Sequence, residues 1–122
     1  MPLLDVTVVG DPPAKSRKGW AGRIAEAAGA VFRSGPGNTW VVLHHLSPED
    51  YAENVAGSGE RDAPVFVRVL KKSLPPESEL EIEVDALTRA VAEVCGRDPA
   101  QVHVIYEPGA TGRVAFGGRV VK

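Results

Sequence analysis

Residues 2–13, PLLDVTVVGDPP, and residues 65–76, VFVRVLKKSLPP, align without a gap when the second stretch is moved back by 63 positions. Each stretch carries apolar side chains at alternate positions and closes on a pair of prolines. The same offset pairs Pro36 with Pro99 and keeps other apolar residues in phase along the chain. Prolines and apolar residues that stay in phase over such a length indicate two copies of one unit.

Each copy predicts a strand, a helix and a second strand. The first strands alternate with a period of two, which places these side chains on one face: Leu4, Val6 and Val8 in the first copy, and Val65, Val67 and Val69 in the second. The helices are predicted from apolar stripes formed by Trp20, Ile24, Ala27, Ala28 and Val31, and by Leu80, Val84, Leu87, Val91, Val94 and Cys95. Gly35 and Gly96 are expected to end the helices, and residues 39–46 and 101–107 are expected to be the closing strands.

A helix that connects two strands of one sheet makes them a parallel pair with a right-handed crossover. Two such units side by side predict an α/β fold, with a four-stranded mixed sheet that carries both helices on one face. We expect a single domain made of two repeats, about 1–56 and 64–122, joined by a surface linker at 57–63.

The helix-free face of this sheet has no covering element in the chain. Its expected apolar residues are Leu3, Trp40, Phe66 and Leu70. Exposed apolar sheet faces usually mark association, and a closed symmetric oligomer buries them most economically.

Composition and charge limit the classes of protein to which the chain can belong. The chain has 122 residues, of which 43% are hydrophobic and 25% charged, and its net charge of −2 gives no sign of a nucleic-acid partner. No segment is long and apolar enough to span a membrane, and none has the pattern of a signal peptide. One cysteine fits a cytoplasmic location, and three scattered histidines do not suggest a metal site, so we expect no metal and no cofactor.

The Met-Pro start, the tandem βαβ pattern and the ending VHVIYEPGATGRVAFGG at 102–118 together resemble the tautomerase superfamily. That superfamily includes 4-oxalocrotonate tautomerase, whose subunit is a single βαβ unit. It also includes fused members such as macrophage migration inhibitory factor, 5-carboxymethyl-2-hydroxymuconate isomerase and malonate semialdehyde decarboxylase. The resemblance covers nearly the whole chain and is closest to the fused type. It implies a homotrimer whose sheets form a barrel with the helices outside, and it implies that Pro2, freed by removal of Met1, is the catalytic group.

The chemistry of a free prolyl nitrogen suits this role. An ordinary α-amino group has a pKa of about 7.7–8.0, and burial or nearby cations lower it, so that the amine can act as a base near neutral pH. Val65, the partner of Pro2 at the offset of 63, is internal, so we expect one active amine per chain. The alternative is a proline that is simply tolerated as the first residue of an edge strand. If Met1 stays in place, the nitrogen of Pro2 is an amide and cannot be a base.

Family substrates carry carboxylates or enols, so the resemblance implies cations or hydrogen-bond donors near Pro2. Lys72 follows the first strand of the second copy, whose end lies near the proline in the family. His103 stands where 4-oxalocrotonate tautomerase has an arginine. The alternatives are a lysine that solvates a strand end and an exposed strand histidine.

Three further positions complete the expected binding site. Arg33 lies near the place of a site lysine in macrophage migration inhibitory factor, although a basic residue also suits a helix C-terminus. Tyr51 falls where 4-oxalocrotonate tautomerase has a site phenylalanine, and a packing role fits it equally well. Phe116 is expected to replace an aromatic residue that is missing at Val114.

These residues predict an isomerase, a keto-enol tautomerase that shifts a proton in a small enol or 2-hydroxydienoate acid. A second reading is a hydratase, dehalogenase or decarboxylase of a small unsaturated or 3-oxo acid. It needs a protonated Pro2 and a water-activating acid, for which Glu49, Glu53 and Glu107 are candidates. A third reading is a non-catalytic trimer that binds a partner through its surface.

Overall fold

The computed structural model describes residues 1–10, 18–54 and 63–122. Its elements, in chain order, are β1 (Leu3–Val9), α2 (Trp20–Phe32), β2 (Trp40–Leu46), η1 (Pro48–Asp50), β3 (Val65–Leu70), α3 (Glu77–Cys95), η2 (Pro99–Gln101), β4 (Val102–Tyr106), β5 (Ala115–Phe116) and β6 (Arg119–Val120). Of the expected linker at 57–63, only Ala63 is among the described residues. The first proline pair, at 12–13, also lies outside them.

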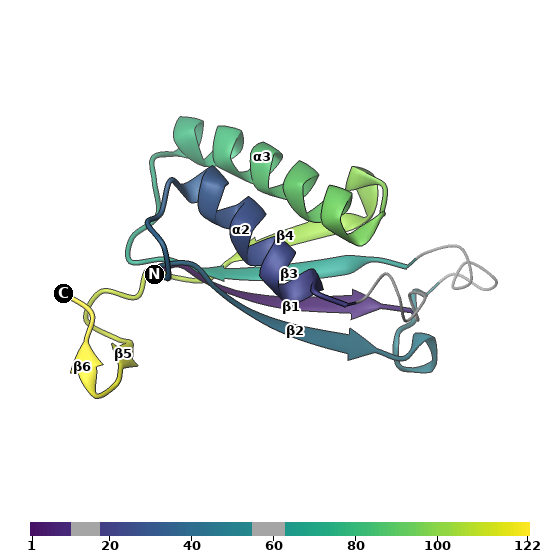
Figure 1. Ribbon diagram of the computed structural model, residues 1–122, viewed down its shortest axis with the longest axis horizontal. Coiled ribbons are helices and arrows are strands. Elements are labelled where there is room, and N and C mark those ends of the chain that lie inside the picture. The colour runs from purple at the N-terminus through teal and green to yellow at the C-terminus, as the bar shows by residue number, and fades with distance from the viewer. Residues whose placement is uncertain (11–17, 55–62) are drawn as a thin grey trace.

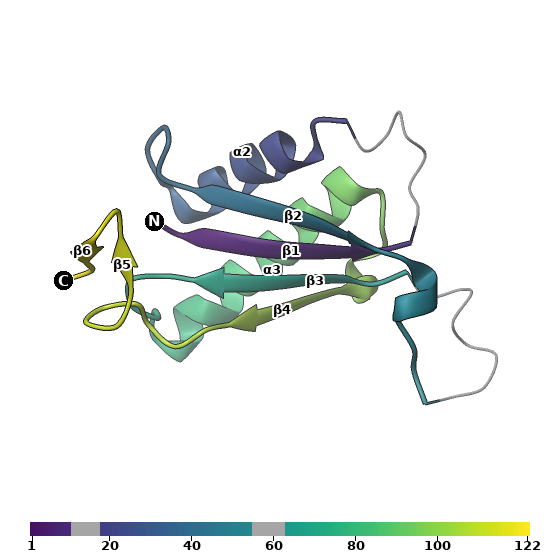
Figure 2. The same ribbon diagram turned by 90° about the horizontal axis from the view of Figure 1, so that it is seen from below.

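The main sheet has the strand order β2-β1-β3-β4. Within each repeat the strands are parallel, and the two repeats meet where β1 pairs antiparallel with β3. Figures 1 and 2 show both helices on one face of this sheet and the short β5–β6 hairpin beyond one end of it. The predicted α/β fold, a four-stranded mixed sheet with two helices on one face, is therefore confirmed.

Strand register repeats between the two units. Leu3 pairs with Trp40 in the first unit and Val65 pairs with Val102 in the second, so each first strand pairs residue i with residue i+37 of its closing strand. Across the unit boundary, Leu3 pairs with Leu70 and Val8 pairs with Val65. The pairing of strands around the start of β1, at one end of the sheet, is thus repeated around the start of β3 at the other end.

A single apolar layer lies between the sheet and the helices. The alternate strand residues predicted to share this face are fully buried: Leu4, Val6, Val8, Val65, Val67 and Val69. From the helices, the fully or nearly fully buried residues are Trp20, Ile24, Ala28, Leu87, Val91, Ala92 and Cys95. Because every second strand residue enters this layer, the register of each strand is fixed by burial.

The first helix ends differently from the prediction. Gly96 caps α3 in the left-handed conformation, as expected. The last residue of α2 is Phe32, and its cap is Arg33 with a φ of 55°, so Gly35 does not end the helix. The N–H groups of Arg33 and Ser34 donate to the carbonyls of Ala30 and Gly29, which satisfies the last helical turn in place of a glycine cap.

The helix-free side of the sheet, called the open face below, comprises Leu3, Asp5, Thr7, Trp40, Val42, His44, Phe66, Arg68, Leu70, His103 and Ile105. Trp40, Val42 and Ile105 are exposed, at 43%, 48% and 40%. Two polar contacts lie among these apolar residues: His44 Nε2 is 3.0 Å from a carboxylate oxygen of Asp5, and Arg68 forms an ion pair with Glu107 (3.2 Å). Within the described residues, this face has no covering layer (Figure 2).

Candidate functional site

Pro2 lies directly ahead of β1 and is buried. Its carbonyl accepts a hydrogen bond from the backbone N–H of Trp40 (3.0 Å), which ties it to the start of β2. The expectation that the proline could begin an edge strand is wrong, because β1 pairs with β2 on one side and β3 on the other. Pro2 precedes the first strand residue, where a missing N–H removes no bond of the sheet. The proline nitrogen is thus held at the end of a central strand.

Two lysines flank this end of the sheet. Leu3 pairs with Leu70, so Lys71 and Lys72 follow along β3 where Pro2 and Met1 precede β1. The backbone of both lysines is fixed from one side: Ala110 donates its N–H to the carbonyl of Lys71 (2.9 Å), and Thr111 donates its N–H and its hydroxyl to the carbonyl of Lys72 (3.2 and 3.0 Å).

The side chain of Lys72 is exposed and makes no hydrogen bond or ion pair with the described residues. An ammonium group in this state can meet an anionic ligand without first losing a protein partner. Lys72 is therefore the cation that this end of the chain leaves available next to Pro2.

Lys71 is bound on the helix face of the sheet. Its ammonium lies 2.6 Å from a carboxylate oxygen of Glu83 on α3, and the Tyr106 hydroxyl donates to the other oxygen of that carboxylate (2.7 Å). The same ammonium stands 5.1 Å from the centre of the Phe32 ring. Burial, together with the neighbouring Glu83 carboxylate, raises the pKa of Tyr106, so its hydroxyl remains a donor. Lys71, Glu83 and Tyr106 are called the Glu83 cluster below.

Sequence reasoning missed this cluster, although a signal for it exists. Glu83 falls on the apolar stripe of α3, between Leu80 and Leu87, and a charged residue in such a stripe usually has a partner. Lys71 is in phase with the buried Val69, and Tyr106 pairs with that same residue. By their positions in the helix and strand periodicity, all three side chains are expected to face the layer between the sheet and α3.

Phe116 is placed at the Pro2 end. Its ring meets that of Trp40 edge to face, with 5.0 Å between ring centres. Because Trp40 also bonds Pro2 through its backbone, this contact places the β5–β6 hairpin next to the start of β1 (Figure 1). Together the two rings form an apolar wall at this end of the sheet.

Arg33 is exposed and follows α2 at the same end of the sheet. It lines a cavity of about 540 Å³ together with Glu26, Ser34 and Thr39. The hydroxyls of Ser34 and Thr39 are hydrogen-bonded to each other. All described residues that line this cavity fall within 25–39, so it is separate from Pro2 and from both lysines.

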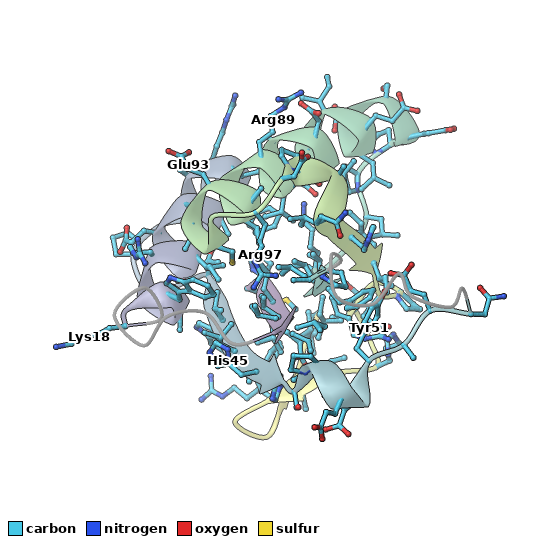
Figure 3. The ribbon with its side chains drawn as sticks, turned by 90° about the vertical axis from the view of Figure 1, so that its right-hand side faces the viewer. Lys18, His45, Tyr51, Arg89, Glu93 and Arg97 are labelled. Carbon is cyan, nitrogen blue, oxygen red and sulfur yellow. The ribbon has the colours of Figure 1, made fainter. Side chains whose placement is uncertain are left out.

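Tyr51 and His103 lie at the opposite end of the sheet. The ring of Phe66 lies between them, 5.9 Å from the centre of Tyr51 and 5.5 Å from that of His103. Phe66 pairs with Thr7, five residues beyond Pro2, which is about 16 Å along the strand at about 3.3 Å per residue. Figure 3 looks onto this end, with Tyr51 labelled, and the N-terminus lies at the other end in Figure 1. A single chain brings Lys72 and Phe116 to the Pro2 end, whereas His103 and Tyr51 stay remote from it.

The remaining titratable groups in the described part of the chain form no metal site and include no reactive thiol. Among the described residues, no three His, Cys, Asp or Glu side chains are grouped so as to hold a metal ion. Cys95 is buried in the core, and this burial raises its pKa to about 11, in keeping with a packing role. The helices of the described ranges include none with the length and apolar character needed to cross a membrane.

No family model and no curated protein matches the chain. Solved structures do match over nearly its full length. A native fused 4-OT aligns with a TM-score of 0.78 at 12% identity, covering 98% of this chain and 95% of that one. A second fused 4-OT, described as a wild-type symmetric trimer, aligns with a TM-score of 0.77 at 19% identity and the same coverage. The FG41 malonate semialdehyde decarboxylase, inhibited by 3-bromopropiolate, gives 0.72 at 19% identity, covering 94% and 88%.

These values establish that the chain has the fold of the fused 4-OT proteins of the tautomerase superfamily. The structural resemblance predicted from the sequence is therefore confirmed. At identities between 12% and 19%, the likeness concerns the fold.

Proposed function

We propose that this chain is a tautomerase-type enzyme in which the secondary amine of Pro2, freed by removal of Met1, shifts a proton in a small enol or 2-hydroxydienoate acid. The observation that carries the proposal is the placement of Pro2. It is buried at the end of a central strand, held by the Trp40 N–H, and flanked by the two residues that follow β3, one of which, Lys72, has no side-chain partner among the described residues. A base needs a fixed position and an apolar, cation-bearing environment to work near neutral pH.

Each group has a simple role in this scheme. The Pro2 nitrogen accepts a proton from the enol oxygen and returns it to a carbon of the same substrate, so no co-reactant is needed. The Lys72 ammonium binds the substrate carboxylate through a charge-assisted hydrogen bond. The rings of Trp40 and Phe116 supply an apolar wall for the carbon chain.

The roles proposed for Tyr51 and His103 require a second chain. Both lie about 16 Å from Pro2 along the sheet, so within one chain they cannot touch a small substrate bound there. We infer that the chain forms a homotrimer in which open faces meet, so that these residues come to the Pro2 of a neighbouring copy. Support comes from the uncovered apolar residues of the open face and from the trimers formed by fused 4-OT relatives of the fold. The proposed role of Arg33, which lines a cavity formed by residues within 25–39, likewise depends on this assembly.

The structural likeness to malonate semialdehyde decarboxylases favours a second candidate, decarboxylation or hydration of a small 3-oxo or unsaturated acid. That chemistry would use Pro2 as an acid and would need a carboxylate to activate water. Glu107 is paired with Arg68, and Glu53 accepts a hydrogen bond from Tyr51 at the far end. The third candidate, Glu49, lies in η1 after β2. Since two of the three candidate acids are already engaged, tautomerisation is the better-supported reaction.

The decisive experiment blocks the amine and keeps the ring. Insertion of an alanine between Met1 and Pro2 converts the proline nitrogen to an amide after Met1 is removed, and intact-mass spectrometry verifies each N-terminus. With a 2-hydroxydienoate substrate followed by absorbance, we expect activity to fall at least about 100-fold, the usual contribution of a general base. Light scattering shows whether the blocked protein keeps the oligomeric state of the wild type. If it does and the blocked protein is still fully active, the role of Pro2 is refuted.

Product analysis separates the alternatives. A wild-type enzyme that releases carbon dioxide or a hydrated product from a 3-oxo or unsaturated acid, and does not ketonise the dienoate, supports the decarboxylase-hydratase reading. A wild-type protein with a free Pro2 amine and no activity on either substrate class favours the non-catalytic, partner-binding trimer.

A further inference from the structure

The Glu83 cluster has no role in the proton transfer described above. Its members come from three elements: Lys71 follows β3, Glu83 belongs to α3, and Tyr106 ends β4. The side chains of Lys71 and Glu83 are only 19% and 15% exposed. Burying an ion pair is costly unless its geometry is good and its remaining hydrogen bonds are made. Here both carboxylate oxygens are used, one by the ammonium and one by the tyrosine hydroxyl.

The cluster lies beside Pro2. Since Leu3 pairs with Leu70 in an antiparallel ladder, the next opposed residues are Pro2 and Lys71. The repeat supports this assignment, because Val8 pairs with Val65, and these residues are the offset partners of Lys71 and Pro2. Opposed residues of such a ladder have Cα atoms about 4.5–5.5 Å apart, so the stem of Lys71 runs next to the proline.

We propose that the Glu83 cluster is a positioning group for the Pro2 amine, in which Glu83 holds the Lys71 ammonium beside the amine and balances its charge. This inference rests on the proposed function, because it assumes that Pro2 carries a free amine. Glu83 and Tyr106 act through Lys71 and do not touch the substrate.

Opposite effects follow from removing either charge. Glu83→Gln leaves the ammonium of Lys71 unbalanced, and a nearby cation disfavours a protonated amine, so the pKa of Pro2 should fall. Lys71→Met keeps an apolar stem against Phe32 but leaves the carboxylate unbalanced, so the pKa of Pro2 should rise. The other cations toward this end, which include Lys72, Arg33, Arg113 and Arg119, are the same in both variants and do not alter the sign of the difference.

The size of the effect follows from electrostatics. A unit charge about 8 Å away changes a pKa by about 0.4 to 1.5 pH units for effective dielectric constants between about 80 and 20. The low exposure of both side chains favours the upper part of this range. A purely structural role for the cluster would change stability without giving shifts of opposite sign.

The experiment measures the Pro2 amine directly, by NMR titration of the Pro2 nitrogen in ¹⁵N-proline-labelled protein after mass spectrometry has shown loss of Met1. We expect the midpoint to fall in Glu83→Gln, to rise in Lys71→Met, and to return close to wild type in the double variant. Glu81→Gln removes the same charge from an exposed residue of the same helix and should leave the midpoint in place. No shift, or shifts of the same sign in both single variants, would overturn the inference.

Two further measurements keep the outcome clear. If Glu83→Gln does not fold, Tyr106→Phe is the substitute, because it removes only one hydrogen bond to the Glu83 carboxylate. The Pro2 midpoint of this variant is measured in the same titration. An unchanged midpoint in both Tyr106→Phe and Lys71→Met would overturn the inference. The pH profile of kcat/KM is recorded alongside. Amine midpoints that move as expected while the kcat/KM profiles stay fixed would support the cluster's effect on Pro2 but refute Pro2 as the catalytic base.

Discussion

Replacing Ile105 with arginine is expected to break the proposed trimer into folded monomers. Ile105 lies on β4, on the open face, and pairs with Arg68 of β3. It is 40% exposed in the isolated chain, and no described element covers it. If three open faces form the interior of an assembly, the exposed part of this side chain is buried there. An arginine at the same place would carry its charge into that interior.

The structure gives the magnitude. Fully burying an isoleucine side chain stabilises by about 1.5–3 kcal/mol, so burying the exposed 40% is worth about 0.6–1.2 kcal/mol per chain. Burying an unpaired charge costs several kcal/mol for each ion. With three copies per trimer, the penalty is on the order of 10 kcal/mol. The sheet itself should stay intact, because the core face of β4 is unchanged.

Light scattering at micromolar concentration measures the assembly, and circular dichroism measures the fold. Ile82→Arg is the matched control, because Ile82 lies on α3 and is already 74% exposed. We expect a trimer mass for wild type and for Ile82→Arg, and a monomer mass with a helical spectrum for Ile105→Arg. A trimer that persists in Ile105→Arg, or a monomeric wild type, would refute the proposed packing of open faces.

Three smaller predictions concern single side chains. Lys72→Ala should lower kcat/KM for an anionic substrate about tenfold or more, on the scale of one charged hydrogen bond, and leave the Tm unchanged because the residue is exposed; an unchanged kcat/KM would remove it from the site. Gly109→Ala should lower the Tm by several degrees in a thermal melt, since a Cβ there would lie 3.0 Å from the backbone oxygen of Lys72; an unaltered Tm would contradict the close packing. Cys95, with its pKa raised to about 11, should react with a thiol reagent at pH 8 far more slowly in native than in urea-unfolded protein, and equal rates would be inconsistent with its burial.

Periodicity predicted the sheet because the buried layer selects every second residue. Val65, Val67 and Val69 are all fully buried, and the intervening Arg68 is exposed. The end of α2 could not be predicted in the same way. A glycine is the usual residue in a left-handed cap, and for this reason Gly35 is the end that the sequence predicts. Instead Arg33 takes that conformation, with its backbone N–H bonded to the last helical turn.

The candidate site could be predicted only in part. Pro2 stands out in the sequence because its nitrogen can act as a base only as a free amine, after removal of Met1. It also stands out because β1 begins immediately after it. Strand phase favoured Lys72 as the available cation, because it places Lys71 in phase with the buried Val69. Phase did not give the partner of Lys71, since Glu83 is remote in sequence and reaches Lys71 through the packing of α3.

Tyr51 and His103 show a second limit of sequence reasoning. The position of His103 on β4 was predictable, because it pairs with Phe66 as the repeat requires, whereas Tyr51 lies outside the strands, just after η1. Their distance from Pro2 follows from the antiparallel pairing of β1 and β3, which places the start of β3 at the end of the sheet opposite to Pro2. Whether they act at a neighbouring Pro2 depends on contacts between chains, and spacing along one chain carries no such information.

The repeat also supplies an internal comparison for the Pro2 end. In the second unit, Val65 takes the place of Pro2, and Val8, which pairs with it, takes the place of Lys71. The cation near that end, Arg97, is bonded to the backbone carbonyls of Val9 and Ala63. The fold therefore tolerates an apolar pair at this position and needs neither a proline nor a lysine there. The start of β1 thus has a proline opposite a lysine, whereas the equivalent start of β3 has a valine opposite a valine. This difference is expected if the Lys71 ammonium acts on the pKa of a free Pro2 amine, because Val65 has no such amine.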